Sequence, residues 1–206
     1  NPDKDPYMAF EKDFMRFMLS DGAGAVLVQD HPEGTCPLKI EWVDMTSYAN
    51  ELPTCMFMAS ELQENGRLKS WKEFSPDEIK ERAVLVGKQD IRQLKKYIIK
   101  YWVDHIETIL AKHHVKAEEI DYVIPHVSSM FFYEKLNDEI AARNIALTKE
   151  KWFTNLTSVG NIGSAAIYVA LEEFIRTKGI KRGNKILLLV PESGRFSYGT
   201  VLLTVE

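Results

Sequence analysis

Three short segments contain the polar residues most able to do chemistry in this chain. PHVSS places His126 directly after an apolar run that ends at Pro125. VGNIGSAA places Asn161 next to Gly160, and ESGRFSYG contains Gly194. A neutral imidazole can donate one hydrogen bond and a carboxamide can donate two. Backbone N–H groups around a turn glycine can bind an anion. These three segments are therefore the candidates for a functional site.

Each segment also has a purely structural explanation. His126 is explained equally by hydrogen bonds to nearby backbone groups. Asn161 stands at the entrance of an apolar helix, where its side-chain oxygen would cap a backbone N–H. Gly194 is the residue of its loop most able to adopt a positive φ, as an ordinary hairpin turn requires. Taken one at a time, the segments leave both explanations open.

The apolar pattern predicts the elements that must position these segments. Alternating or continuous apolar runs predict strands at residues 25–28, 38–46, 121–126, 185–191 and 198–206. Apolar residues at spacings of three and four predict helices at 8–19, after Ser75-Pro76, at 88–113, 129–143 and 162–178. Strands and helices that alternate in this way indicate an α/β fold with a mixed central sheet. His126 then follows the carboxyl end of a strand, where α/β proteins usually bind ligands.

Composition narrows the class of protein. The chain has 206 residues, 45% of them hydrophobic and 27% charged, which is typical of one soluble globular domain. The net charge of −4 gives no electrostatic reason to expect a nucleic-acid partner. No apolar run reaches the roughly 18 residues that a membrane span needs. The first ten residues lack an apolar signal core, so we expect no secretory leader and a cytoplasmic location.

Other motifs give less information about the function of this chain. Cys36 and Cys55 have no metal-type spacing and are too few for a disulfide framework. The sequence contains no HExxH, CxxC or P-loop pattern, so we expect no metal or nucleotide site. A methionine-rich patch, CMFMAS, includes Met56 and Met58, and flexible methionines suit a pocket for an acyl chain. The chain does not begin with Met, which indicates processing or a piece of a longer protein.

Four segments occur in one order along the chain, DGAGAVLV, PHVSS, VGNIGSAA and ESGRFSYG. This set resembles the C-terminal half of β-ketoacyl-[acyl-carrier-protein] synthase III, in the thiolase superfamily. The resemblance runs from about Ser20 to the end, and residues 47–86 form an irregular excursion that matches poorly. It implies that residues 1–206 form one thiolase-like lobe, a mixed sheet with helices on both faces.

The resemblance also implies a reaction. An acyl thioester and malonyl-carrier protein undergo a decarboxylative Claisen condensation, in fatty-acid or related lipid and polyketide biosynthesis. His126 and Asn161 would be the catalytic pair that stabilises the enolate, and Gly194 would supply an N–H to the oxyanion hole. The substrates would be acyl-CoA or acyl-carrier-protein thioesters, with no cofactor. The expected partners are the acyl carrier protein and a second copy in a homodimer. Candidates for the substrate pocket are Met56, Met58, Ser128, Phe131 and Ile162.

This sequence departs from the family pattern at several positions. Neither Cys36 nor Cys55 lies at a helix start among small residues, where the family has its nucleophile. We therefore expect the chain to need an N-terminal half and to be inactive alone. Val127-Ser128-Ser129 replaces the usual Gln-Ala-Asn, and Phe131 replaces a basic residue linked to docking. Ser193 and Arg195 stand where glycine is preferred. Two alternatives stay open: acyl transfer without decarboxylation, and a non-catalytic scaffold for dimerisation or carrier binding.

Overall fold

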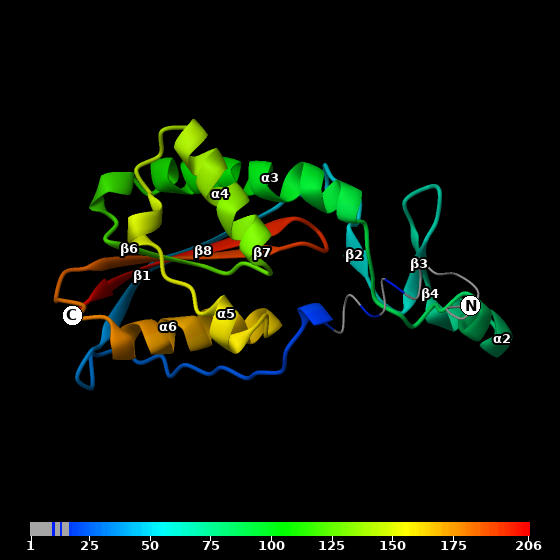
Figure 1. The fold of residues 1–206 in the computed structure, drawn as a ribbon, viewed down its shortest axis with the longest axis horizontal. Coiled ribbons are helices and arrows are strands. Elements are labelled where there is room, and N and C mark those ends of the chain that lie inside the picture. The colour runs from blue at the N-terminus through cyan, green and yellow to red at the C-terminus, as the bar shows by residue number, and fades with distance from the viewer. Residues whose placement is uncertain (1–9, 11–12, 14–16) are drawn as a thin grey trace.

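The computed structural model describes residues 10, 13 and 17–206. Most of the helix predicted at 8–19 lies outside the described residues. A central sheet contains four strands in the order β1-β8-β7-β6 (Figure 1). β6 and β7 are parallel, whereas β7, β8 and β1 pair antiparallel, so the sheet is mixed as predicted. The strands span Leu38–Ser47 (β1), Tyr122–Pro125 (β6), Lys185–Glu192 (β7) and Ser197–Val205 (β8).

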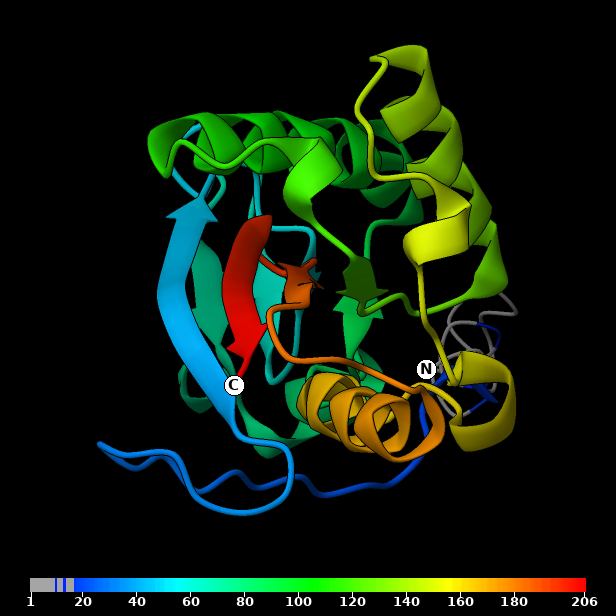
Figure 2. The ribbon, with the colours of Figure 1, turned by 90° about the vertical axis from the view of Figure 1, so that its left-hand side faces the viewer.

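Helices cover both faces of this sheet, which confirms the predicted α/β class (Figure 2). α3 (Ile91–Lys112) and α4 (Met130–Ala142) pack on one face, around buried residues such as Trp102, Leu136 and Leu187. α6 (Ala166–Thr177) covers part of the other face, where Phe174 packs among Ile186, Leu188 and Leu203. α5 (Leu156–Val159) precedes α6. Apolar residues three and four positions apart therefore form the inward face of each long helix.

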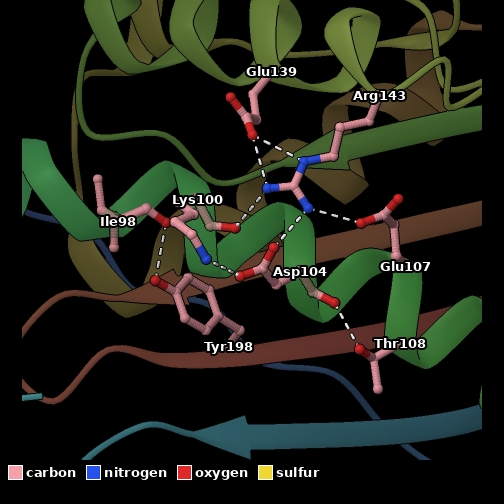
Figure 3. A network of polar contacts seen from close by, with 8 residues as sticks. All are labelled: Ile98, Lys100, Asp104, Glu107, Thr108, Glu139, Arg143 and Tyr198. Atoms are coloured by element: carbon pink, nitrogen blue, oxygen red, sulfur yellow. Dashed lines mark hydrogen bonds and ion pairs between the residues drawn. The ribbon is translucent and has the colours of Figure 1, made fainter. Parts of the chain in front are cut away.

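Ion pairs of Arg143 link α4 to α3 (Figure 3). Arg143 follows the last turn of α4, and its guanidinium lies 2.6 Å from Asp104, 2.7 Å from Glu107 and 2.7 Å from Glu139. Asp104 and Glu107 belong to α3, whereas Glu139 belongs to α4. Planar guanidinium groups bind several carboxylates at fixed angles, so this contact sets the position of α4 relative to α3.

Residues 56–89 form the irregular excursion, which projects from one end of the sheet (Figure 1). The helix predicted after Ser75-Pro76 is present as α2 (Pro76–Glu81), and Ser75 and Glu78 cap its start reciprocally. The other pieces are two short antiparallel strand pairs, β2 (Met56–Phe57) with β5 (Lys88–Gln89) and β3 (Ser60–Leu62) with β4 (Leu68–Ser70). Short 3-10 turns lie at Trp71–Glu73, Ala117–Glu119, Lys149–Lys151 and Gly163–Ala165.

The strand predicted at 25–28 is wrong, because no neighbouring strand among the described residues pairs with this segment. Val26, Leu27 and Val28 are 59%, 83% and 67% exposed. The segment runs along the outside of α6 instead (Figure 1). A Cβ on Gly24 would lie 2.5 Å from the Cβ of Tyr168, so only glycine permits this close approach.

The helix predicted at 162–178 begins later, at Ala166. Gly160 and Gly163 have φ angles of +82° and +60°, and this left-handed backbone turns the chain before the helix starts. Among the described residues, no helix is both long and apolar enough to cross a membrane.

Candidate active site

A cavity of about 350 Å³ lies at the carboxyl ends of the parallel strands β6 and β7. α3 supplies an apolar wall with Leu94, Ile98 and Trp102, and Phe132 of α4 extends it. The polar lining comes from other elements: His126 and Ser128 after β6, Asn161 and Ser164 before α6, Glu192 and Ser193 at the end of β7, and Gln89 of β5. The cavity is therefore an apolar chamber with polar groups at the sheet edge, as small-molecule sites usually are.

His126 continues the line of β6 into this cavity. Its backbone N–H donates to the carbonyl of Leu189 over 2.8 Å, which holds the residue against β7. Its side chain is half-buried and makes no hydrogen bond to the described residues. Burial lowers the pKa of the imidazole below its ordinary value of 6.5, because desolvation disfavours the charged form. The ring is thus neutral at pH 7, with one N–H to donate.

Asn161 lies in the turn between α5 and α6. Its Oδ1 accepts the N–H of Gly163 over 3.2 Å, and its backbone carbonyl accepts the N–H of Ser20 over 2.8 Å. These contacts fix the side chain without using Nδ2, which donates to none of the described residues. Asn161 is not the N-cap of α6, since Ala165 holds that position. The amide therefore supports the local turn with its oxygen and keeps two N–H donors for the cavity.

Gly194 is placed differently from the prediction. It does not have a positive φ, and the left-handed residue of this loop is Phe196 with φ 51°. A Cβ on Gly194 would lie 3.2 Å from the Met56 carbonyl oxygen, so close backbone packing explains the glycine. Its N–H donates to Oε1 of Glu192, and Gly194 itself is not among the lining residues. The amide thus lies next to the cavity with its hydrogen bond already made.

The five pocket candidates divide into two groups. Ser128 and Met56 line the cavity. Phe131 and Met58 do not, because their side chains lie at the surface, 51% and 70% exposed. Ile162 is buried at 8% exposure and is also outside the lining.

The neighbouring Phe132 takes the place expected for Phe131, since one step along a helix rotates a side chain by about 100°. Sequence reasoning missed the apolar wall of α3. Its three-and-four spacing identified a buried face, but the same spacing also describes ordinary core packing.

Neither cysteine lines the cavity. Cys55 is fully buried, and burial raises the pKa of its thiol to about 12, so it stays protonated at neutral pH. Cys36 packs beside the core under α6. No group of three or more His, Cys, Asp or Glu side chains in the described part of the chain is arranged to hold a metal ion.

Comparison with known proteins finds sequence similarity to one family of enzymes. Residues 110–205 match the family described as "3-Oxoacyl-[acyl-carrier-protein (ACP)] synthase III C terminal". A β-ketoacyl-[acyl-carrier-protein] synthase III of Clostridium perfringens is 28% identical over 186 residues, which cover 90% of this chain and 52% of that protein. The synthase III of Aquifex aeolicus is 33% identical over 112 residues, covering 54% and 34%. The chain thus spans about half the length, or less, of these curated relatives.

Solved structures share the fold. The crystal structure of the Aquifex aeolicus 3-oxoacyl-[acyl-carrier-protein] synthase III superposes with a TM-score of 0.55 at 24% identity, covering 81% of this chain and 44% of that one. A tetronic acid condensing enzyme superposes with a TM-score of 0.60 at 12% identity, covering 82% and 47%. Residues 110–205 are therefore similar to the C-terminal domain of 3-oxoacyl-[acyl-carrier-protein] synthase III, and the chain shares the fold of these solved structures.

Proposed function

We propose that this chain is the C-terminal part of a synthase III-like condensing enzyme. The enzyme would join an acyl thioester to a malonyl thioester on the acyl carrier protein, with loss of CO₂, in fatty-acid or related lipid or polyketide biosynthesis. One observation carries the proposal: His126 and Asn161, far apart in the sequence, line the same cavity. The apolar wall of α3 offers room for an acyl chain or a carrier arm.

The two side chains match the charge that decarboxylation creates. When the C–C bond to the malonyl carboxylate breaks, CO₂ leaves and its electron pair forms an enolate with negative charge on the thioester oxygen. The neutral imidazole of His126 and the Nδ2 of Asn161 would each donate a hydrogen bond to that oxygen. The enolate carbon then attacks the acyl-cysteine carbonyl, and the bond to the cysteine sulfur breaks. Loss of one such donor costs on the order of a hundredfold in rate.

The nucleophilic cysteine would belong to an N-terminal half. Two features support such a partner lobe. Neither Cys36 nor the protonated Cys55 reaches the cavity. Val43 and Met45 of β1 are 65% and 73% exposed, and an apolar partner would bury them. We further propose that the complete enzyme is a cytoplasmic homodimer that binds the acyl carrier protein, and that this chain alone is inactive.

The test uses the full-length protein with malonyl and acyl thioesters. We expect His126→Ala and Asn161→Ala each to lower the release of labelled CO₂ by about a hundredfold. His31→Ala is the matched control, because His31 lies in an exposed turn away from the cavity. Parental rates of CO₂ release in both cavity variants would refute the assigned roles. Acyl transfer without any CO₂ release would identify an acyltransferase, and no turnover at all would favour a scaffold.

A further inference from the structure

The carboxylate of Glu192 accepts hydrogen bonds from two backbone amides of the loop that joins β7 to β8. Its Oε1 accepts the N–H of Gly194, and its Oε2 accepts the N–H of Arg195 over 3.0 Å. Both carboxylate oxygens are therefore bound to consecutive backbone donors. Two successive N–H groups that converge in this way form an anion-binding concavity. The structure shows this concavity already filled by a side chain of the same loop.

Glu192 also lines the cavity that His126 and Asn161 line. The carboxylate that accepts the Gly194 N–H thus belongs to a residue of the candidate active site. None of the lysines and arginines in the described part of the chain forms an ion pair with Glu192. The side chain is exposed at the cavity mouth, so a rotation into water would solvate its charge. The two amides are consequently the main partners that hold the carboxylate in place.

The loop has anchors that do not involve the Glu192 side chain. The Gly194 carbonyl accepts the N–H of Cys55 over 2.9 Å. The Ser193 hydroxyl accepts from Nε2 of Gln89 over 3.1 Å, and the Phe196 carbonyl accepts from the N–H of Tyr48 over 3.1 Å. These contacts tie the loop to β5 and to the segment after β1. The loop can therefore keep its shape when the carboxylate leaves.

We infer that Glu192 is a displaceable occupant of the Gly194 amide, and that it competes with the thioester oxygen of the substrate for this donor. The inference rests on the proposed function. During acylation, a cysteine thiolate attacks the thioester carbonyl carbon, a C–S bond forms, and the carbonyl oxygen becomes an anion. That oxyanion takes the Gly194 N–H only if Glu192 has turned away. The oxyanion then collapses, and the bond to the carrier sulfur breaks to release a thiolate.

The neutral thioester carbonyl is a weaker acceptor than a carboxylate, whereas the oxyanion carries a full charge. The neutral carbonyl therefore leaves Glu192 in place, and the free-energy cost of displacing the carboxylate is added to the transition state for acylation. Glu192→Gln keeps the size of the side chain but replaces the anion by a neutral amide. It weakens the competitor without removing the packing of the loop. Removal of this competing carboxylate should therefore speed acylation.

The experiment measures single-turnover acylation of the full-length protein by a short acyl-CoA, with intact-protein mass spectrometry. We expect Glu192→Gln and Glu192→Ala to raise the acylation rate constant by about threefold to tenfold. Glu64→Gln removes the same charge from an exposed turn and should acylate at the parental rate. An acylation rate in both Glu192 variants that equals or falls below the parental rate would overturn the inference and make Glu192 a support of the loop.

A second measurement does not depend on turnover. Ser193-Gly194 is the one Ser-Gly pair in these 206 residues, so carbonyl-labelled serine with ¹⁵N-glycine leaves few signals in NMR spectra of the full-length protein, and the signal that Gly194→Ala removes is the Gly194 amide. Glu192→Gln should move this amide proton upfield, and Glu64→Gln should not. An unmoved proton would overturn the inference. If His126→Ala keeps the parental decarboxylation rate while Glu192→Gln still speeds acylation, the proposed decarboxylation role fails and the Glu192 inference stands.

Discussion

The backbone carbonyl of Asn161 accepts a hydrogen bond of 2.8 Å from the N–H of Ser20. This contact joins the segment before the first strand of the sheet to the residue that faces the cavity. The same turn includes Gly160, whose φ of +82° sets the direction of the chain into Asn161. The position of the carboxamide thus depends on two backbone features that lie outside the cavity lining.

We predict that Gly160→Ala disturbs Asn161 from a distance. A Cβ at this position would lie 2.4 Å from Oγ of Ser20, and the left-handed φ disfavours any side chain. The free energy of unfolding should fall by about 1–2 kcal/mol. Malonyl decarboxylation should fall more than this loss of stability explains. Gly179→Ala is the control, since a Cβ there meets nothing within 4 Å; equal rates in the two variants would contradict the prediction.

We predict that His105 makes the protein less stable in mild acid. This buried imidazole bonds Thr200 over 2.9 Å, and burial lowers its pKa from 6.5 to about 4. Because the folded-state pKa lies below the unfolded one, its contribution is complete above pH 6.5 and is lost as pH falls toward 4.

Urea denaturation at pH 7.5 and pH 5 should show a loss of about 2 kcal/mol from this group. His105→Leu should remove that part of the pH dependence, while His31→Ala should not. An unchanged pH slope in His105→Leu would refute the assignment.

We predict that Arg143→Met loosens the junction of α3 and α4. The substitution keeps an unbranched apolar stem but leaves Asp104, Glu107 and Glu139 without their shared cation (Figure 3). Removal of one partner from a half-buried charge cluster should cost about 1–3 kcal/mol. Chemical denaturation measures this loss, and high salt should reduce it because salt screens the remaining carboxylates. Arg176→Met, at an exposed pair within α6, should cost less than about 0.5 kcal/mol.

We predict that Ile99→Phe shortens the space for an acyl chain. Ile99 is partly buried and lines the cavity on α3. The added ring volume should raise KM for long acyl thioesters by about tenfold, since one to two kilocalories of apolar contact are lost. The KM for an acetyl thioester should change little. Steady-state kinetics over a series of chain lengths measures the difference, and a uniform change across the series would show that α3 does not bound the acyl site.

Local sequence patterns predicted most of the elements correctly. The apolar period of residues 88–113 corresponds to α3, and the apolar run at 185–191 corresponds to β7. Ser75-Pro76 marked the start of α2. These features depend on side chains close together in the chain, so their physical cause is visible in the sequence. The strand prediction for residues 25–28 was wrong because a strand needs a partner strand, and distant segments decide which strands pair.

The same distinction holds for the candidate site. His126 and Asn161 were predicted from residue type and order, and the structure brings both to one cavity. The sequence by itself determined which donors are present and which elements carry them. Only the tertiary structure decided that Phe132 lines the cavity in place of Phe131 and that Glu192 fills the Gly194 amide. A helix turns each side chain by about 100°, and a loop aims its amides through contacts with remote strands. These directions arise from packing between segments that are distant in the chain.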